Sequence, residues 1–331
     1  DALPIFNNTD SSSIINYASF SADDLYADTK TLRYGQAGLR FTGTFGGFDI
    51  GASYYYGHTK QPSANTLGVF TVNAAAEAAK KLVAAATQAQ KAAQAAAAAG
   101  QTAVAATAAA QATQYAAQAT VLGNYATSAL ATVDLPSLDY DAVQVFGLEM
   151  ATVIWKFNTR WEFAYNLTND IAGDDPWVKN NWISWVGGFD IDLPLHNLNL
   201  NVQETGSVVI NSDSIGDRKI SLGSISVPLK ECDVDYNSDD RYHTNKIIVL
   251  LKDTFMNEKI SIELQGIWGI ENQEFVLIPR FNFNVFDGLT FNAQMAYIYS
   301  DNENGEFYQF TAANDEHHNQ LFVQLGAKYS F

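Results

Sequence analysis

Apolar residues occupy every second position in many short segments of this 331-residue chain. Near its end, Leu321, Val323 and Leu325 share one face of an extended chain, and Gln324 and Gly326 share the opposite face. A period of two with one apolar face is typical of a half-buried β-strand. The pattern predicts eleven clear strands, and one weaker segment makes twelve.

The clear strands are expected at residues 36–45, 48–56, 143–155, 161–165, 182–193, 198–209, 247–253, 260–268, 275–285, 289–299 and 320–331. The weaker strand lies near residues 14–21. Pro279 falls inside a predicted strand. Because proline cannot donate a ladder hydrogen bond, a local bulge is expected there.

The connections between these strands alternate in length. The short turns are expected at 46–47, 157–160, 194–197, 254–259 and 287–288. The intervening loops are mostly long and polar, at 57–141, 167–180, 210–245 and 300–318, whereas 269–274 is short. Outer-membrane barrels have short periplasmic turns and longer extracellular loops. We therefore expect an all-β transmembrane fold, a closed antiparallel up-and-down barrel of about 12 strands.

Aromatic residues lie near both ends of the predicted strands, where two membrane interfaces select them. The expected interface aromatics are Tyr54, Tyr56, Trp161, Trp182, Trp268, Tyr299, Tyr329 and Phe331. A soluble β-sandwich is the alternative for so many alternating strands. The two aromatic belts on an otherwise apolar face favour the barrel.

The ending LGAKYSF, residues 325–331, resembles that of Gram-negative outer-membrane β-barrel (porin-like) proteins. The resemblance covers the strand regions at 12–58 and 142–331. It implies an integral outer-membrane location, with long loops outside and both termini in the periplasm. In that family the barrel-assembly machinery reads this ending, and lipid and lipopolysaccharide surround the barrel. A homo-oligomer, a trimer by analogy, is a further expectation of the resemblance.

Residues 73–132 are mostly Ala, Gln and Thr, and Gly100 divides them. Alanine is the strongest helix former, so this segment predicts an α-helical hairpin of the coiled-coil kind. Projection from the extracellular side is favoured over folding into the lumen, self-association or a loop without a role. The organisation is one barrel domain: first strands at 1–58, an insertion at 59–138 and the remaining strands at 139–331.

The net charge is −17, and no stripe of Lys and Arg is present that could neutralise phosphates. These features argue against a nucleic-acid partner. Cys232 is the single cysteine, so an internal disulfide is excluded. No apolar run approaches the roughly 18 to 20 residues that a membrane helix needs. No signal peptide is visible before Asp1, which leaves open whether this residue begins the mature protein.

Alternation places charged residues of both signs inside the barrel, where lumen residues tune passage. The expected pore-lining residues are Arg40, Asp49, Glu149, Arg160, Glu162, Asp190, Asp192, Lys252, Glu263, Arg280 and Lys328. Facing rows of Arg and of Glu or Asp could create a transverse electric field in a pore that ions or small polar solutes cross. The alternative is that they pair across the interior and plug it.

The acidic loops lack the spacing of a calcium loop, so no metal site is expected. His58, His243, His317 and His318 map near the loop ends, but no convergent catalytic geometry follows from sequence. The chain is expected to be no enzyme and to hold no cofactor. The expected function is passive passage through an outer-membrane channel. The alternative is a surface structural or adhesion protein whose barrel anchors the hairpin.

Overall fold

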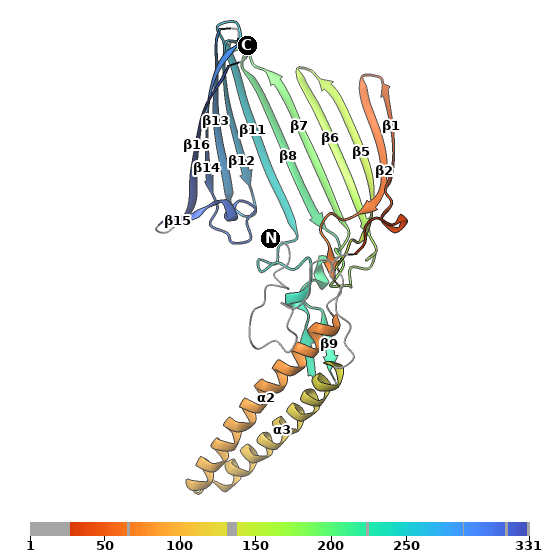
Figure 1. Ribbon diagram of the computed structural model, residues 1–331, viewed down its shortest axis with the longest axis vertical. Coiled ribbons are helices and arrows are strands. Elements are labelled where there is room, and N and C mark those ends of the chain that lie inside the picture. Colours follow the sequence, from red (N-terminus) through yellow and green to blue (C-terminus); the bar gives the residue numbers. More distant parts are fainter. Residues whose placement is uncertain are drawn as a thin grey trace.

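A single large β-sheet dominates the computed structural model, which describes residues 27–64, 67–130, 138–222, 225–286, 288–314 and 317–329. The sheet has twelve strands in the order β1-β2-β5-β6-β7-β8-β11-β12-β13-β14-β16-β15, and every neighbouring pair is antiparallel (Figure 1). The order follows the chain except that β15, three residues long, covers one end of β16. The β-sandwich alternative is not observed in the described residues, because the long strands form one sheet.

The strands of this sheet are β1 (Ala37–Phe45), β2 (Phe48–His58), β5 (Ala142–Ile154), β6 (Phe157–Thr168), β7 (Trp182–Asp192), β8 (Asn199–Val209), β11 (His243–Phe255), β12 (Ile260–Gly269), β13 (Glu274–Phe286), β14 (Leu289–Tyr299), β15 (Ala312–Asn314) and β16 (His317–Tyr329). Two short sheets lie outside it. They pair β3 (Ser63–Ala64) with β4 (Leu138–Asp139), and β9 (Lys219–Leu222) with β10 (Ile225–Pro228).

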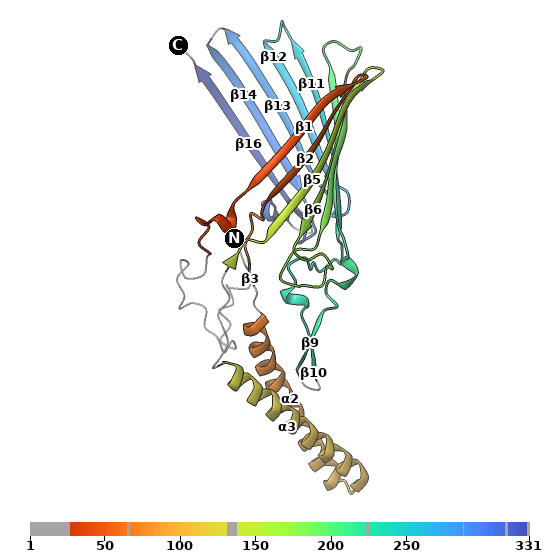
Figure 2. The same ribbon diagram turned by 90° about the vertical axis from the view of Figure 1, so that its right-hand side faces the viewer.

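Strand pairing gives the sheet one polar and one apolar face. Residues paired across strands point to the same side, and successive residues in one strand point to opposite sides. The row Thr42, Gly51, Glu149 and Glu162 lies on the polar face. Figure 2 shows that the sheet curls strongly from β1 to β16.

The apolar face is exposed rather than buried in a core. Large side chains on this face include Phe41 at 67% exposed, Leu148 at 63%, Val323 at 61% and Leu325 at 78%. Water-soluble monomers rarely expose contiguous apolar patches larger than a few hundred Å². The face therefore needs an apolar environment outside the protein.

The two long edges of the sheet, β1 and β16, are not paired with each other in the described residues. The sheet that the structure describes is therefore open, which differs from the closed barrel expected from sequence. The twelfth strand expected near residues 14–21 lies outside the described residues. The eleven clear strands expected from alternation are all present as the long strands of the sheet.

The short turns lie together at one end of the sheet, and the long connections lie at the other end (Figure 1). One predicted turn is misplaced: β5 and β6 meet at Trp155 and Lys156, not at 157–160. Ladder pairing continues to Ile154 and Phe157, and Trp155 adopts the positive φ of 59° that the tight turn requires. Asn158 and Thr159 suggested a turn by composition, but they pair as strand residues.

The predicted bulge at Pro279 is also wrong. Pro279 pairs with Leu264 of β12, and the register of β13 with β14 is the same before and after it. The register of β13 shifts instead between Asn284 and Phe286, beside the turn. The missing N–H of Pro279 is thus accommodated without an inserted residue.

A helical hairpin occupies the long connection between β2 and β5, as the alanine content predicted. Helix α2 (Leu67–Ala98) and helix α3 (Thr102–Leu130) are joined at Gly100, whose φ is +73°. Gln101 donates its N–H to the carbonyl of Ala96, a capping bond that favours glycine at this position. At 1.5 Å per residue the arms are about 48 and 44 Å long. None of the described helices is both long enough and apolar enough to span a membrane.

The two helices pack mainly through alanine residues. The packed positions recur in steps of three and four, which is the spacing of coiled-coil seams. The seam of α2 comprises Ala75, Ala79, Leu82, Ala86, Ala89, Ala93 and Ala96, and that of α3 comprises Ala105, Ala108, Ala112, Tyr115, Ala119, Leu122, Ala126 and Ala129. At the base of the hairpin, Val227 of β10 packs against the cluster around Leu122. The hairpin extends away from the long-loop end of the sheet (Figures 1 and 2).

Ala119→Leu should destabilise the hairpin by about 1–3 kcal/mol, because a larger side chain overpacks the seam. Ala119 is 6% exposed, whereas Ala117 on the same helix is exposed. Thermal unfolding followed by circular dichroism at the helical band, in detergent, measures the effect. Ala117→Leu is the matched control and should change little; equal losses in both variants would contradict this packing.

Candidate functional site

All eleven charged residues expected to line a pore lie on the polar face of the sheet. The register links them in rows: Asp49 pairs with Thr44 and Ala151, and Arg160 pairs with Ala151. Lys252 pairs with Glu263, which pairs with Arg280. The remaining members, Arg40, Glu149, Glu162, Asp190, Asp192 and Lys328, share this face through the same alternation.

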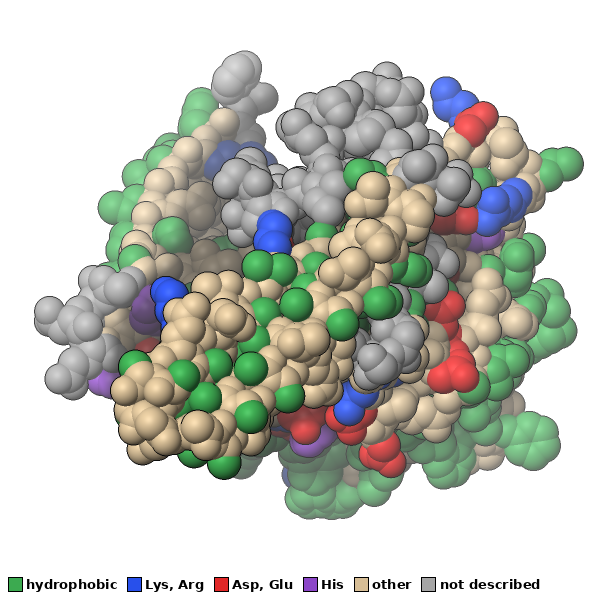
Figure 3. All heavy atoms as spheres, turned by 90° about the horizontal axis from the view of Figure 1, so that it is seen from below, with side chains coloured by type: hydrophobic (Ala, Val, Ile, Leu, Met, Phe, Trp, Pro, Cys, Tyr) green, Lys and Arg blue, Asp and Glu red, His purple; other side chains and the backbone are tan. Residues whose placement is uncertain are grey.

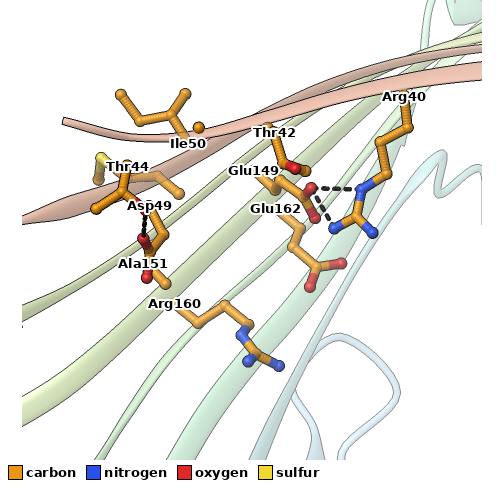
Figure 4. Close-up of a pocket in the computed structure, with 12 residues that line it drawn as sticks. Arg40, Thr42, Thr44, Asp49, Ile50, Glu149, Ala151, Arg160 and Glu162 are labelled. Carbon is orange, nitrogen blue, oxygen red and sulfur yellow. Dashed lines mark hydrogen bonds and ion pairs between the residues drawn. The ribbon is translucent and has the colours of Figure 1, made fainter.

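Several hollows in this face are lined by the first six strands of the sheet. A cavity of about 560 Å³ is bordered by Arg40, Asp49, Glu149, Arg160 and Glu162 (Figure 4). Two adjoining cavities of about 420 Å³ each share Glu162 with it and extend over β7 and β8. The polar side chains therefore border a continuous hollowed surface rather than separate pits.

The polar face of β1 to β8 carries an excess of negative charge. Among the predicted residues, Arg40 and Arg160 stand against Asp49, Glu149, Glu162, Asp190 and Asp192, a formal charge of −3. We call this set of seven residues the acidic wall. Arg40 donates through Nε to Glu149 at 2.7 Å. Within the described residues, neither Arg160 nor Glu162 forms an ion pair.

The other carboxylates of the acidic wall accept hydrogen bonds from neutral groups. The Thr44 hydroxyl donates to Asp49 at 2.7 Å. Asn158 donates to Asp190 at 2.8 Å, and Asn199 donates to Asp192 at 2.8 Å. These bonds orient the carboxylates without cancelling their charge.

The opposite part of the polar face, on β11 to β16, has the reverse balance. Lys252, Arg280 and Lys328 stand against Glu263, a formal charge of +2. We call these four residues the basic wall. Glu263 is shared by two cations, because Lys252 Nζ lies 3.3 Å and Arg280 Nη1 lies 3.7 Å from its carboxylate.

Most of the predicted interface aromatics lie on the apolar face, by the same register. Tyr54 pairs with Phe146, Trp161 with Met150, and Trp268 with Phe275, which pairs with Tyr299. Tyr56 and Tyr329 also lie on that face. Trp182 differs: it pairs with Asn166, which places it on the polar face beside the long loops. Phe331 lies outside the described residues.

Sequence reasoning missed one charged residue on the apolar face. Glu204 lies in the middle of β8 and pairs with Gly187 and Ile247. The indole Nε1–H of Trp185 donates to both oxygens of its carboxylate, at 3.0 and 2.9 Å. The sequence holds one signal for this placement, because Glu204 occupies the position after Leu200 and Val202 at which the alternation calls for an apolar residue. Sequence reasoning also omitted Lys246 and Glu274, which lie on the polar face near the loops.

The long connections are joined to one another by buried polar contacts. Arg218 donates to Asp233 at 2.7 Å and to Asn180 at 3.1 Å, and the paired side chains are only 8% and 0% exposed. Burial raises the pKa of the Asp233 carboxyl, and Arg218 opposes that shift. Asp170 accepts three backbone N–H groups, from Gly173, Asp174 and Asp175. The connections after β6 and β8 are thus held as one body.

A second group of contacts fixes the connection after β14. Glu274, 2% exposed, accepts hydrogen bonds from Ser300 and from the backbone of Glu306 and Phe307. Asn302 donates to Asp239, which ties this connection to the one after β8. The loop end of the sheet therefore has a defined polar structure.

The four histidines considered as catalytic candidates have separate partners. His243 lies 3.8 Å from Glu271, and His317 lies 3.0 Å from Asp301. His318 stacks on Tyr308, and the ring of His58 lies against Tyr34. In the described part of the chain, no group of three or more His, Cys, Asp or Glu is arranged to hold a metal ion.

The chain resembles solved structures but no known family or curated sequence. No family model matches the chain, and no curated protein matches it. The chain is similar to the outer membrane phospholipase A from Escherichia coli, at 10% identity and a TM-score of 0.27. The match covers 89% of this chain and 77% of that chain. That protein is named as an outer-membrane protein.

The same match corrects the expectation that the chain is no enzyme, because the matched protein is named for a phospholipase activity. At this identity and TM-score, the match carries no active site or substrate over to the present residues.

Asp301 gives a testable pH dependence at the loop end. The backbone N–H of His318 at 2.7 Å, the Tyr299 hydroxyl and His317 lower the pKa of Asp301 from 3.8 to about 2. A carboxyl whose pKa falls on folding stabilises the folded state above its unfolded pKa. That stability is lost as the pH falls from about 4 to about 2. Asp301→Asn should flatten the pH dependence of the unfolding temperature in this window.

Glu303→Gln, which removes an exposed carboxyl from the same loop, is the matched control. It should keep the wild-type slope between pH 4 and pH 2. Parallel curves for wild type and Asp301→Asn would show that these hydrogen bonds do not act on stability.

Proposed function

We propose that this protein is an outer-membrane β-barrel channel for passive passage of ions or small polar solutes. The observation that carries the proposal is the division of one curled sheet into an exposed apolar face and a hollowed, charged polar face. A charged Lys or Arg facing lipid near the midplane costs about 2–4 kcal/mol, so lipid favours the apolar face outward. In this proposal the long loops are extracellular, and lipid and lipopolysaccharide surround the barrel.

The proposal includes closure of the sheet into a barrel. Ten successive antiparallel pairings separate β1 from β16, so these two edge strands run in the same direction. Direct closure would make a parallel pair, whereas outer-membrane barrels are antiparallel throughout. One additional strand, opposite in direction, would pair with both edges and give the even number expected.

The segment before residue 27 is the proposed source of that strand. The backbone N–H of Ala27 donates to the carbonyl of Leu138, at the loop end of the sheet. Strand β1 then runs from the loop end to the turn at Gly46, so a preceding antiparallel strand would finish where Ala27 lies. Residues 14–21, which lie outside the described residues, are the segment that the sequence pattern predicts for this strand.

Disulfide cross-linking tests this closure. In a Cys232→Ser background, a cysteine at Thr42 of β1 or at Gln324 of β16 is combined with single cysteines at positions 14–20. Both edge cysteines should form intramolecular bonds with alternate positions of the segment, because alternate residues share a face. Direct bonding between positions 42 and 324, or bonds only between two chains, would contradict closure by this segment.

Passage would be shaped by the two walls. The acidic wall and the basic wall lie on different parts of the curled polar face, so a closed barrel would set their opposite charges across the lumen. A solute would meet a transverse field there. The outward course of α2 and α3 also supports an unobstructed lumen, because neither helix lies over the polar face of the sheet (Figure 2).

Planar-bilayer recording of the purified chain tests the channel. Discrete conductance steps are expected, and deletion of residues 73–132 should keep or raise them, because the hairpin projects from the loop end. The projecting hairpin is also the feature that favours the second candidate, a surface structural or adhesion protein. A silent barrel whose hairpin self-associates or binds a surface would overturn the channel in favour of that candidate.

A further inference from the structure

We propose that the pore passes cations in preference to anions, and that the cations follow the polar surface of β7 and β8. This inference rests on the channel proposed above and adds a class of solute to it. It depends on which charges of the lumen have a partner of opposite sign.

The polar face of β7 and β8 carries oxygen-bearing side chains and no Lys or Arg. Asp190 and Asp192 lie at its turn end, and Asn201, Gln203 and Thr205 follow along β8 toward the loops. A cavity of about 420 Å³ is lined by Asp49, Asp190, Asn201 and Gln203, so these side chains border open space. Carboxylate and amide oxygens are suitable partners for a partly hydrated cation.

The negative charge at the turn end of this path exceeds the positive charge near it, because Arg160 is the one cation among the described residues that line the cavity with Asp49, Glu162 and Asp190. Asp190 and Asp192 accept hydrogen bonds from the amides of Asn158 and Asn199, both at 2.8 Å. A neutral donor fixes the direction of a carboxylate and leaves its full charge in the lumen. Both groups therefore attract cations and repel anions at the same place.

The positive charge across the lumen is smaller and partly compensated. Lys252 and Arg280 share Glu263, at 3.3 and 3.7 Å. Lys246, nearer to the loops, forms an ion pair with Glu306. Lys328 forms no ion pair among the described residues, so the basic wall keeps its formal charge of +2 against −3 on the acidic wall. Cations passing along β7 and β8 would therefore meet the larger net charge.

The loops beyond β8 and β11 are acidic as well, around a hollow that adjoins Val208 and His243 of the apolar face. This hollow of about 580 Å³ between the ends of β8 and β11 is lined by Asp213, Asp217 and Asp240 together with Lys230. The Lys230 ammonium is held 4.6 Å from the centre of the Tyr236 ring. Figure 3, seen from the hairpin end, shows carboxylates gathered among the loops. Charge of one sign at a mouth raises the local concentration of counter-ions.

Ion selectivity in asymmetric KCl tests the proposal with the full-length chain in planar bilayers. The reversal potential should give a permeability ratio of K⁺ to Cl⁻ above one. Asp190→Asn combined with Asp192→Asn should lower this ratio by about twofold or more, since it removes two negative charges. Asn201→Asp adds a carboxylate to the same path and should raise the ratio.

Glu258→Gln is the control, because it removes one carboxyl from the short turn between β11 and β12, outside the proposed path. It should leave the ratio unchanged. A conducting wild type with equal or anionic preference overturns this inference and leaves the channel intact. An unchanged ratio in the Asp190 and Asp192 variant also overturns the inferred path. A wild type without conductance overturns the channel and the inference together.

Discussion

Backbone hydrogen bonding between antiparallel strands is the interaction on which the other features of this molecule depend. Each ladder fixes which residues lie opposite one another, and that register fixes which side chains share a face. A slip of one residue in β6 would exchange Arg160 and Glu162 with Thr159 and Trp161. The separation of charge from apolar surface is therefore a consequence of register, and no packed core between sheets is needed to maintain it.

The same constraint explains where the polar contacts of the molecule concentrate. Along the strands the backbone is satisfied by its neighbours, so side chains are free to line a surface. The connections lack a ladder, and their backbone groups need other partners. The Asp170 carboxylate accepts three backbone N–H groups after β6, and Glu274 accepts two from the connection after β14. The buried pair of Arg218 with Asp233 then joins segments that would otherwise lie apart.

Alternation predicted the strands and the faces of their charged residues well, because a period of two is a local property of the chain. The position of Glu263 and Arg280 on the polar face follows from their neighbours in sequence alone. The helical hairpin was predictable for a similar reason, since alanine favours helix regardless of its surroundings. Properties that depend on pairing with distant residues were less accessible. Trp182 was assigned to the wrong face because its strand begins there and has no preceding alternation to fix its side.

Other features of the site had no local signal. That Lys252 and Arg280 share one carboxylate depends on the register of three strands, which no single segment contains. The partner of Glu204 is Trp185 on the preceding strand, so its placement on the apolar face looked like an interruption of the pattern. Turn position was ambiguous at Trp155, because the residues that resemble a turn follow the actual one.

The hairpin of α2 and α3 leaves and re-enters the sheet at adjacent strands. Its two ends are brought together by the small sheet of β3 with β4, and β2 still pairs with β5 along its whole length. Because the small residues of its seam recur every seven positions, matched heptads added to or removed from both arms would move the tip outward or inward by about 10 Å at a time. The reach of the hairpin is thereby decoupled from the geometry of the sheet, and the two can vary independently.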